Sequence, residues 1–89
     1  MKFALGKIVI TAGCKTHMKS INEQPLMYLM RHVSGDWGDL GRDDTQANEQ
    51  AINRPIRILS RYTLSDWSSI YIITESDRSY TTIMFCDDY

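Results

Sequence analysis

The sequence predicts a small α+β domain in which helices cover one face of an antiparallel sheet. Two runs rich in β-branched and aromatic residues, Ile70–Thr74 and Tyr80–Phe85, flank the polar segment Glu75–Ser79, which has the length of a hairpin loop. Between residues 25 and 34, apolar side chains recur at helical spacing. The expected order is one strand, two helices, a weaker third helix and a three-stranded antiparallel meander, all in a single domain spanning residues 1–89.

Charge and cysteine content narrow the functional classes. The formal net charge is −1, which argues against nucleic acid as a partner because proteins that bind it carry a basic surface. The two cysteines, Cys14 and Cys86, have no metal-ligand spacing and form no dense disulfide framework, so we expect a cytoplasmic protein without metal or cofactor. Residues 1–11 do not have the pattern of a signal peptide, and no apolar run is long enough to span a membrane.

The chain opens with a short strand and a short helix. Lys7–Thr11 is β-branched and does not alternate between polar and apolar residues, which predicts a strand buried on both faces. Cys14, Met18 and Ile21 then recur at helical spacing and predict the first helix.

The second helix is the clearest element of the sequence. Pro25–Ser34 begins with a proline, which suits a first helical turn, and Gly35 follows as a stop that can take a left-handed conformation. Its apolar side chains form a single stripe that we expect to be buried: Leu26, Leu29, Met30 and Val33. The run Met27, Tyr28 and Met30 also permits a partner-binding face, with packing in the core or at its rim as the favoured alternative.

A glycine-rich loop, Gly35–Gly41, and an acidic third helix come next. The acids of residues 36–49 could hold a cation or imitate phosphates. The plainer interpretation is that Asp43 caps a helix running from about Asp44 to Ile52, with Gln46 completing a capping box.

The meander begins after this helix. Pro55–Leu64 alternates apolar residues with a cationic outer row that includes Arg57 and Arg61, which predicts a half-buried strand. The residues at 65–68 form a turn into the hairpin described above.

The loops at residues 35–41 and 75–79 are the predicted recognition surface of a binding protein. Their acids, guanidinium and hydroxyl groups could pair with a partner's charges, although Asp77 and Arg78 could equally fix the turn and Trp37 could tie its loop to the core. The candidate binding residues are Asp36, Trp37, Asp39, Glu75, Asp77, Arg78 and Thr81.

A ribonuclease is the alternative from a different functional class. The predicted order of helices before a meander is similar to that of RelE/ParE-like toxins, in which a base, an acid and cations surround a phosphate. The residues that could form such a site on the sheet face are His32, Arg57, Arg61, Glu75 and Arg78. The net charge of −1 opposes this alternative, and His32 could instead interact with the C-terminus of its helix.

Four stretches carry a resemblance to a known family: Gly6–Val9, Leu29–Leu40, Arg57–Tyr62 and Ile72–Ile83, including the blocks Gly-Asp-Trp-Gly and Thr-Glu-Ser-Asp-Arg-Ser. The sequence resembles small bacterial, plasmid and phage proteins labelled "plasmid-related protein" or "type I restriction endonuclease subunit M". The resemblance implies a mobile-element setting and brings no catalytic residues with it. A methyltransferase is excluded because 89 residues cannot hold its cofactor-binding fold and no glycine-rich cofactor loop follows a strand.

Together these observations predict a non-enzymatic protein that acts by contact with a host or defence protein. If Trp67, Tyr71 and Tyr80 are exposed together on the sheet face away from the helices, they would indicate a homodimer.

Overall fold

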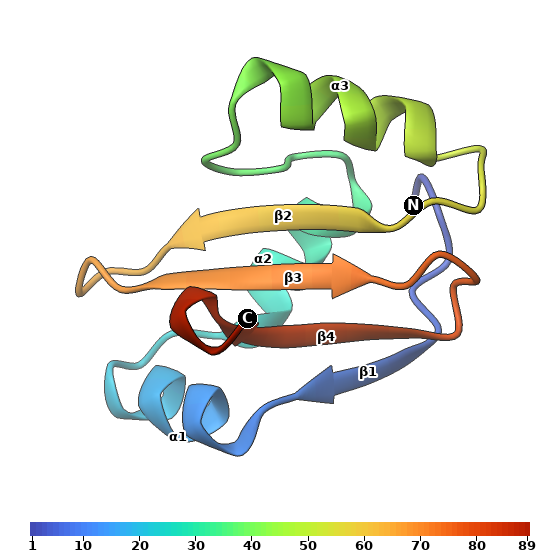
Figure 1. The fold of residues 1–89 in the computed structure, drawn as a ribbon. Coiled ribbons are helices and arrows are strands. Elements are labelled where there is room, and N and C mark those ends of the chain that lie inside the picture. Colours follow the sequence, from blue (N-terminus) through green and yellow to red (C-terminus); the bar gives the residue numbers. More distant parts are fainter.

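A mixed four-stranded sheet forms the centre of the computed structural model, which describes residues 1–89 (Figure 1). The strands β2 (Ile58–Thr63), β3 (Ser69–Thr74) and β4 (Tyr80–Phe85) form an antiparallel meander, and β1 (Lys7–Ile10) joins it in parallel beside β4. The order across the sheet is β1-β4-β3-β2. The predicted α+β class, the three-stranded meander and the additional N-terminal strand are therefore confirmed.

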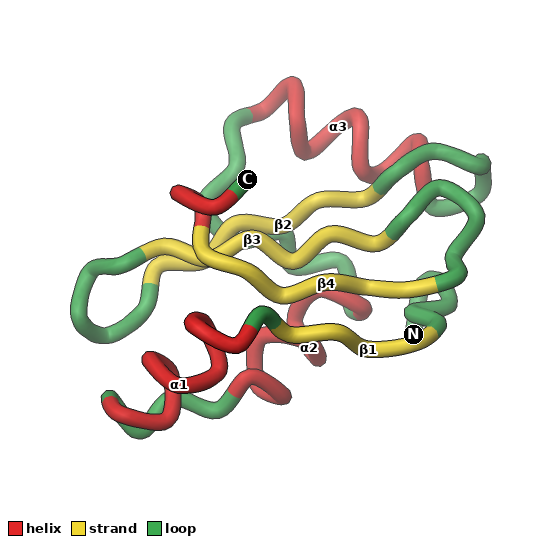
Figure 2. Tube along the Cα trace, turned by 60° about the horizontal axis from the view of Figure 1, so that its bottom comes forward, coloured by secondary structure: helices red, strands yellow, loops and turns green.

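Two helices cover one face of the sheet. Figure 2 shows α1 (Ala12–Ser20) and α2 (Pro25–Val33) on this face, with the C-terminal turn η1 (Cys86–Asp88) on the other. The third helix, α3 (Arg42–Ala51), lies beside β2 at one edge of the sheet (Figure 1). None of these helices combines the length and the apolar character that crossing a membrane requires.

The core has two parts. The larger cluster joins α1 and α2 to the sheet: Cys14, Met18, Leu29, Tyr62, Leu64, Ile70, Ile72 and Ile83. The smaller joins the N-terminal segment, α2, α3 and β2: Phe3, Val33, Trp37, Ala51 and Ile58. Each large buried side chain contributes roughly 1.5–3 kcal/mol before conformational entropy is subtracted.

The prediction that the first strand is buried on both faces is wrong. β1 is an edge strand that pairs only with β4, and Lys7, Ile8 and Val9 are exposed. A short apolar run is typical of a central strand with a neighbour on each side. Whether a strand is central or at an edge depends, however, on how all the strands of the sheet pair.

The predicted buried stripe of α2 is only half correct. Leu29 and Val33 are buried, whereas Leu26 and Met30 are 64% and 54% exposed. The face that packs on the sheet instead includes His32, which is fully buried. The helix is therefore rotated relative to the expectation, because a polar residue occupies a core position.

Two element boundaries also differ from the prediction. α3 begins at Arg42, with Gly41 as its N-cap and no side-chain hydrogen bond at the cap, so Asp43 is not the capping residue that was predicted. Asp43 and Asp44 lie in the first turn, where their negative charges interact favourably with the helix dipole. β2 begins at Ile58 and not at Pro55. Within β2 the predicted alternation holds, with Ile58 and Tyr62 buried.

Candidate functional site

His32 lies at the centre of a buried polar network between α2 and the sheet. Its Nδ1 lies 2.6 Å from Oγ of Ser60, and its Nε2 lies 2.9 Å from Oγ1 of Thr74. Oγ1 of Thr74 is 2.8 Å from Oγ1 of Thr81, which donates a hydrogen bond to the carbonyl of Leu5. All four side chains of the network are buried, and every ring nitrogen and hydroxyl in it has a partner.

This placement decides what His32 and Thr81 can do. Burial lowers the pKa of His32 to about 4, so the ring is neutral at neutral pH. Because both ring nitrogens are already engaged and the side chain has no exposed surface, His32 has no access to a substrate in solution. The network supports the core, since satisfied buried polar groups favour a single arrangement of the elements that share them. Thr81 belongs to the same network and not to a surface loop.

The loop at residues 35–41 closes one edge of the sheet. The carbonyl of Trp37 accepts a hydrogen bond from the backbone N–H of Arg61, and the N–H of Asp39 donates to the carbonyl of Arg61 at 2.7 Å. The indole of Trp37 is buried and donates to Glu49 on α3. Gly38 has a φ of +75°, and a Cβ there would lie 2.0 Å from the carbonyl oxygen of Arg61. The glycine is thus required by the close approach of this loop to β2.

The two aspartates of this loop stay at the surface but have partners. Asp36 forms an ion pair with Arg31 at 2.7 Å, and their hydrogen bond is the largest cause of the lowered pKa of Asp36. Asp39 accepts a hydrogen bond from the hydroxyl of Thr63. Nowhere in the structure do three His, Cys, Asp or Glu side chains gather closely enough to hold a metal ion.

Arg78 is bound by the fold. Its guanidinium donates to the backbone carbonyls of Ala51 at 2.6 Å, Ile56 at 2.7 Å and Arg54 at 3.0 Å, and so ties the β3–β4 loop to the segment after α3. Asp77 accepts a hydrogen bond from the N–H of Ser79 and shapes the turn. Asp77 therefore pairs with the backbone of its own loop and not with Arg78.

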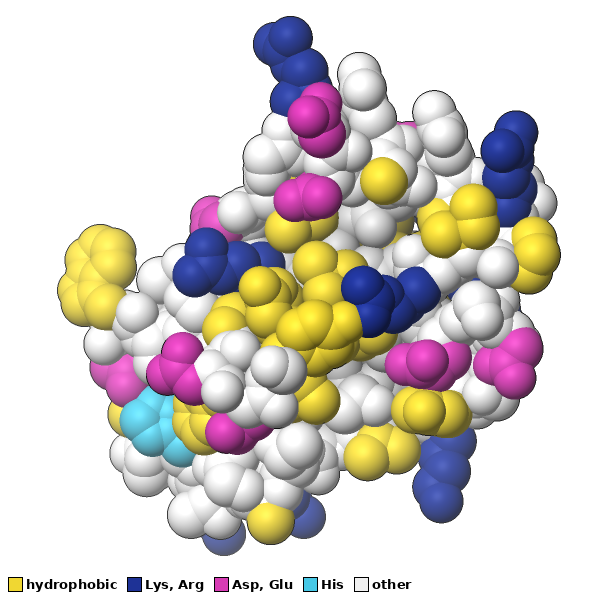
Figure 3. Space-filling view, in the orientation of Figure 1, with side chains coloured by type: hydrophobic (Ala, Val, Ile, Leu, Met, Phe, Trp, Pro, Cys, Tyr) yellow, Lys and Arg dark blue, Asp and Glu magenta, His cyan; other side chains and the backbone are white.

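The residues of the nuclease alternative are not brought together. His32 points from α2 into the core on the helix-covered face of the sheet, whereas Arg61 alternates with the buried Ser60 and Tyr62 and points to the opposite face. Arg57 lies on that opposite face with Tyr89, whose ring also contacts Tyr71. Figure 3 shows this face, where hydrophobic side chains gather over the middle of the sheet between Lys or Arg side chains.

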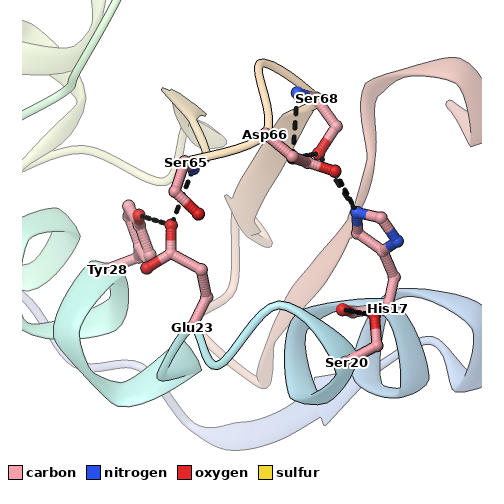
Figure 4. Close-up of polar contacts among 7 residues, drawn as sticks. All are labelled: His17, Ser20, Glu23, Tyr28, Ser65, Asp66 and Ser68. Carbon is pink, nitrogen blue, oxygen red and sulfur yellow. Dashed lines mark hydrogen bonds and ion pairs between the residues drawn. The ribbon is translucent and has the colours of Figure 1, made fainter.

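The three aromatic residues considered for a homodimer do not form one exposed face. Trp67 is 85% exposed at the tip of the β2–β3 turn, whereas Tyr71 lies within the sheet against Tyr89. The turn is held firmly to the helices, as Figure 4 shows. His17 on α1 contacts Asp66 at 2.7 Å, and Glu23 accepts a hydrogen bond from the backbone N–H of Ser65.

The two edges of the sheet differ in their cover. The edge at β2 is covered by the loop at residues 35–41 and by α3. In Figure 1, α1 follows the end of β1, and no strand lies beyond β1 at the lower edge of the sheet. An uncovered edge strand presents unpaired backbone N–H and C=O groups, with which a strand of another chain can pair.

A groove lies between this open edge and the helices. It has a volume of about 330 Å³ and is lined by Ile8, Ile10, Lys15, Pro25, Leu26, Leu29 and Ile83. Its β1 wall includes Ile8, which is 43% exposed, and its α2 wall includes Leu26. Met30 lies one helical turn from Leu26 and continues the exposed apolar surface along α2, together with Met27. We call these residues the β1–α2 surface.

The β1–α2 surface was not among the candidate sites predicted from the sequence. The only signal in the sequence is the methionine-rich run of α2, which permits a partner-binding face but is more typical of packing in the core or at its rim. No family model, curated protein or solved structure matches this chain.

Proposed function

We propose that this chain is a small non-enzymatic binding protein that acts by contact with a host or defence protein through the β1–α2 surface. The observation that carries the proposal is the exposure of large apolar side chains beside an uncovered strand edge. Ile8 of β1 and Leu26, Met27 and Met30 of α2 are all exposed large hydrophobic residues. Such a concentration on two neighbouring elements is typical of protein interaction sites.

The loops predicted as the recognition surface give less support than β1 and α2. Trp37 is buried, and Arg78 is occupied by backbone carbonyls, so neither is free to bind a partner without loss of its role in the fold. Asp36, Asp39, Glu75 and Asp77 are available at the rim of the molecule and stay secondary candidates.

A mobile-element setting in a bacterial cytoplasm is part of the proposal. It is supported by the sequence resemblance described above and by the low cysteine content, with both cysteines free. The ribonuclease alternative has no comparable support, because His32 is fully buried on one side of the sheet and Arg57 and Arg61 lie on the other.

The test is a tagged pull-down from bacterial host cells followed by mass spectrometry. The informative variant is Leu26→Asp combined with Met30→Asp, since both side chains are more than half exposed. Trp67→Asp is the control, because it places one such aspartate at an exposed apolar position far along the chain. Circular dichroism checks that all proteins fold.

We expect a host protein that the wild type and the Trp67→Asp control retain and that the double variant loses. Retention by the double variant would show that the β1–α2 surface is not the contact. An empty pull-down with the wild type, or cleavage of RNA by the purified protein, would overturn the proposed function itself.

A further inference from the structure

We infer that the partner contributes an extended segment with alternating apolar and acidic residues, which adds to the sheet as a fifth strand beside β1. This inference rests on the proposed function and specifies the chemistry of its partner. Three features of β1 and its surroundings carry it: the free backbone groups of the strand, the apolar groove beside it and the charge around it.

The outward backbone groups of β1 come from its pairing with β4. The N–H of Lys7 donates to the carbonyl of Ser79, and the N–H of Thr11 donates to the carbonyl of Ile83. Because backbone groups alternate in direction along a strand, the N–H and C=O groups of Ile8 and Ile10 point away from β4. A partner strand would satisfy these groups in the manner of β-strand addition.

The side chains at the same positions supply the specificity. Ile8 and Ile10 line the groove together with Leu26 and Leu29, on the face that carries the helices. A segment paired with β1 would direct every second side chain into this groove, whose lining is apolar apart from Lys15 and therefore favours apolar groups. The intervening side chains would point to the other face of the sheet or to solvent, where Lys7 and Val9 lie.

Charge around the groove selects acidic residues in the partner. The first 22 residues contain four lysines and no Asp or Glu. Lys15 lines the groove, and Lys19 lines the adjoining depression. Lys7, Lys15 and Lys19 form no ion pair. The ion pairs of the structure join His17 to Asp66 and Arg31 to Asp36.

One acid lies in the same depression as two of these lysines but forms no ion pair with them. Glu23 shares the depression with Lys15 and Lys19, but its carboxylate accepts hydrogen bonds from the hydroxyl of Tyr28 and the N–H of Ser65 (Figure 4). Lys7 lies on the face to which the intervening side chains of the partner would point and can pair with carboxylates there, whereas Lys15 and Lys19 attract them during the approach to the edge.

The same charges disfavour a second copy of this chain at the edge. A two-fold pairing of β1 with itself would place the same positive segment on both sides of the interface, and like charges across an interface are unfavourable. A lysine at a strand edge also protects against self-association. The geometry thus favours a foreign acidic strand.

The experiment uses two synthetic peptides and the ¹⁵N-labelled full chain. In one peptide valine and isoleucine alternate with aspartate; in the other, lysine replaces each aspartate. NMR titrations follow the amide signals of Ile8 and Ile10. We expect saturable shifts of these signals with the acidic peptide only.

Two variants separate the backbone from the charge. Ile8→Pro removes an outward N–H without removing a hydrogen bond to β4, so the fold should survive while the peptide no longer binds. Lys7→Glu with Lys15→Glu should weaken binding by about tenfold or more, an effect that high salt reduces. Arg42→Glu with Arg54→Glu changes the net charge equally at a distance from β1 and should leave the affinity within about twofold.

Several outcomes would overturn the inference. Shifts confined to residues other than β1, equal binding of the lysine peptide, or full binding by Ile8→Pro would each contradict strand addition by an acidic segment. A wild-type dimer that Ile8→Pro converts to a monomer would assign the edge to a second copy. If the host protein is lost by Leu26→Asp/Met30→Asp but retained by Ile8→Pro, strand addition fails while the proposed function stands.

Discussion

The ring of His32 and the hydroxyl of Ser60 join α2 to β2 through a 2.6 Å contact inside the core. Nε2 of the same ring reaches Thr74 on β3, so one side chain links a helix to two strands. Since an unpaired polar group in this position would cost about 1–3 kcal/mol, the network allows few other positions of α2 on the sheet.

The burial of His32 predicts a stability that depends on pH. The folded pKa is about 4 and the unfolded chain has the ordinary value of 6.5, so between these values the unfolded chain binds more protons. Stability is fully present above pH 6.5 and falls as the pH is lowered toward 4, by about 3 kcal/mol in all. Urea denaturation at a series of pH values measures this change in the free energy of unfolding.

His32→Gln removes the titrating group, so the loss of about 3 kcal/mol between pH 6.5 and 4 should disappear in this variant. Ser60→Ala is the control: it should lower the free energy of unfolding by about 1–3 kcal/mol at all pH values and keep the slope. An unchanged slope in His32→Gln would show that other groups cause the pH dependence.

The contacts of Arg78 predict that its substitution lowers the stability of the fold, whereas the sequence suggested that it would abolish binding to a partner. Its φ is +61°, so Arg78→Gly removes the guanidinium without adding backbone strain. We expect the free energy of unfolding to fall by about 2–4 kcal/mol, because the carbonyls of Ala51, Arg54 and Ile56 lose a charged donor. Asp77→Ala should cost under about 1 kcal/mol, and an equally small effect of Arg78→Gly would contradict its structural role.

Two glycines predict opposite effects of the same substitution. Gly38→Ala should destabilise the protein by at least about 2 kcal/mol, since its Cβ would meet the carbonyl of Arg61 and the ring of Tyr62 at a positive φ. Gly13→Ala lies in α1 with nothing near its Cβ and should stabilise by about 0.5–1 kcal/mol. Thermal denaturation compares the two, and equal signs would contradict the geometry.

The cysteines predict unequal reactivity toward a thiol reagent. Cys14 is fully buried, and burial is the main cause that raises its pKa to about 11, whereas Cys86 is partly exposed. One thiol should react rapidly in the native protein and both in denaturant. Cys86→Ser should abolish the rapid phase; if it persists, Cys14 is reached without unfolding.

Much of the fold could be predicted from the sequence, because its signals are local. Pro25 and Gly35 bound α2, and the alternation of β2 correctly placed Ile58 and Tyr62 inside. The candidate site could be predicted far less well. A fully buried histidine and a structural arginine look like catalytic or binding groups until their partners are known, and the partners of His32 lie 28 and 42 residues away.

The pattern of apolar and polar residues determined which segments became helices and strands, since each element depends on the repeat of its own side chains. The pairing of distant segments decided the rest. Whether Lys7–Ile10 is central or at an edge depends on β4, more than 70 positions later in the register of Lys7 with Tyr80. The rotation of α2 likewise depends on Ser60 and Thr74, which accept His32 into the core and leave Leu26 and Met30 at the surface. The β1–α2 surface thus arises from contacts between segments that are distant in the sequence, and the local residue pattern of neither segment predicts these contacts.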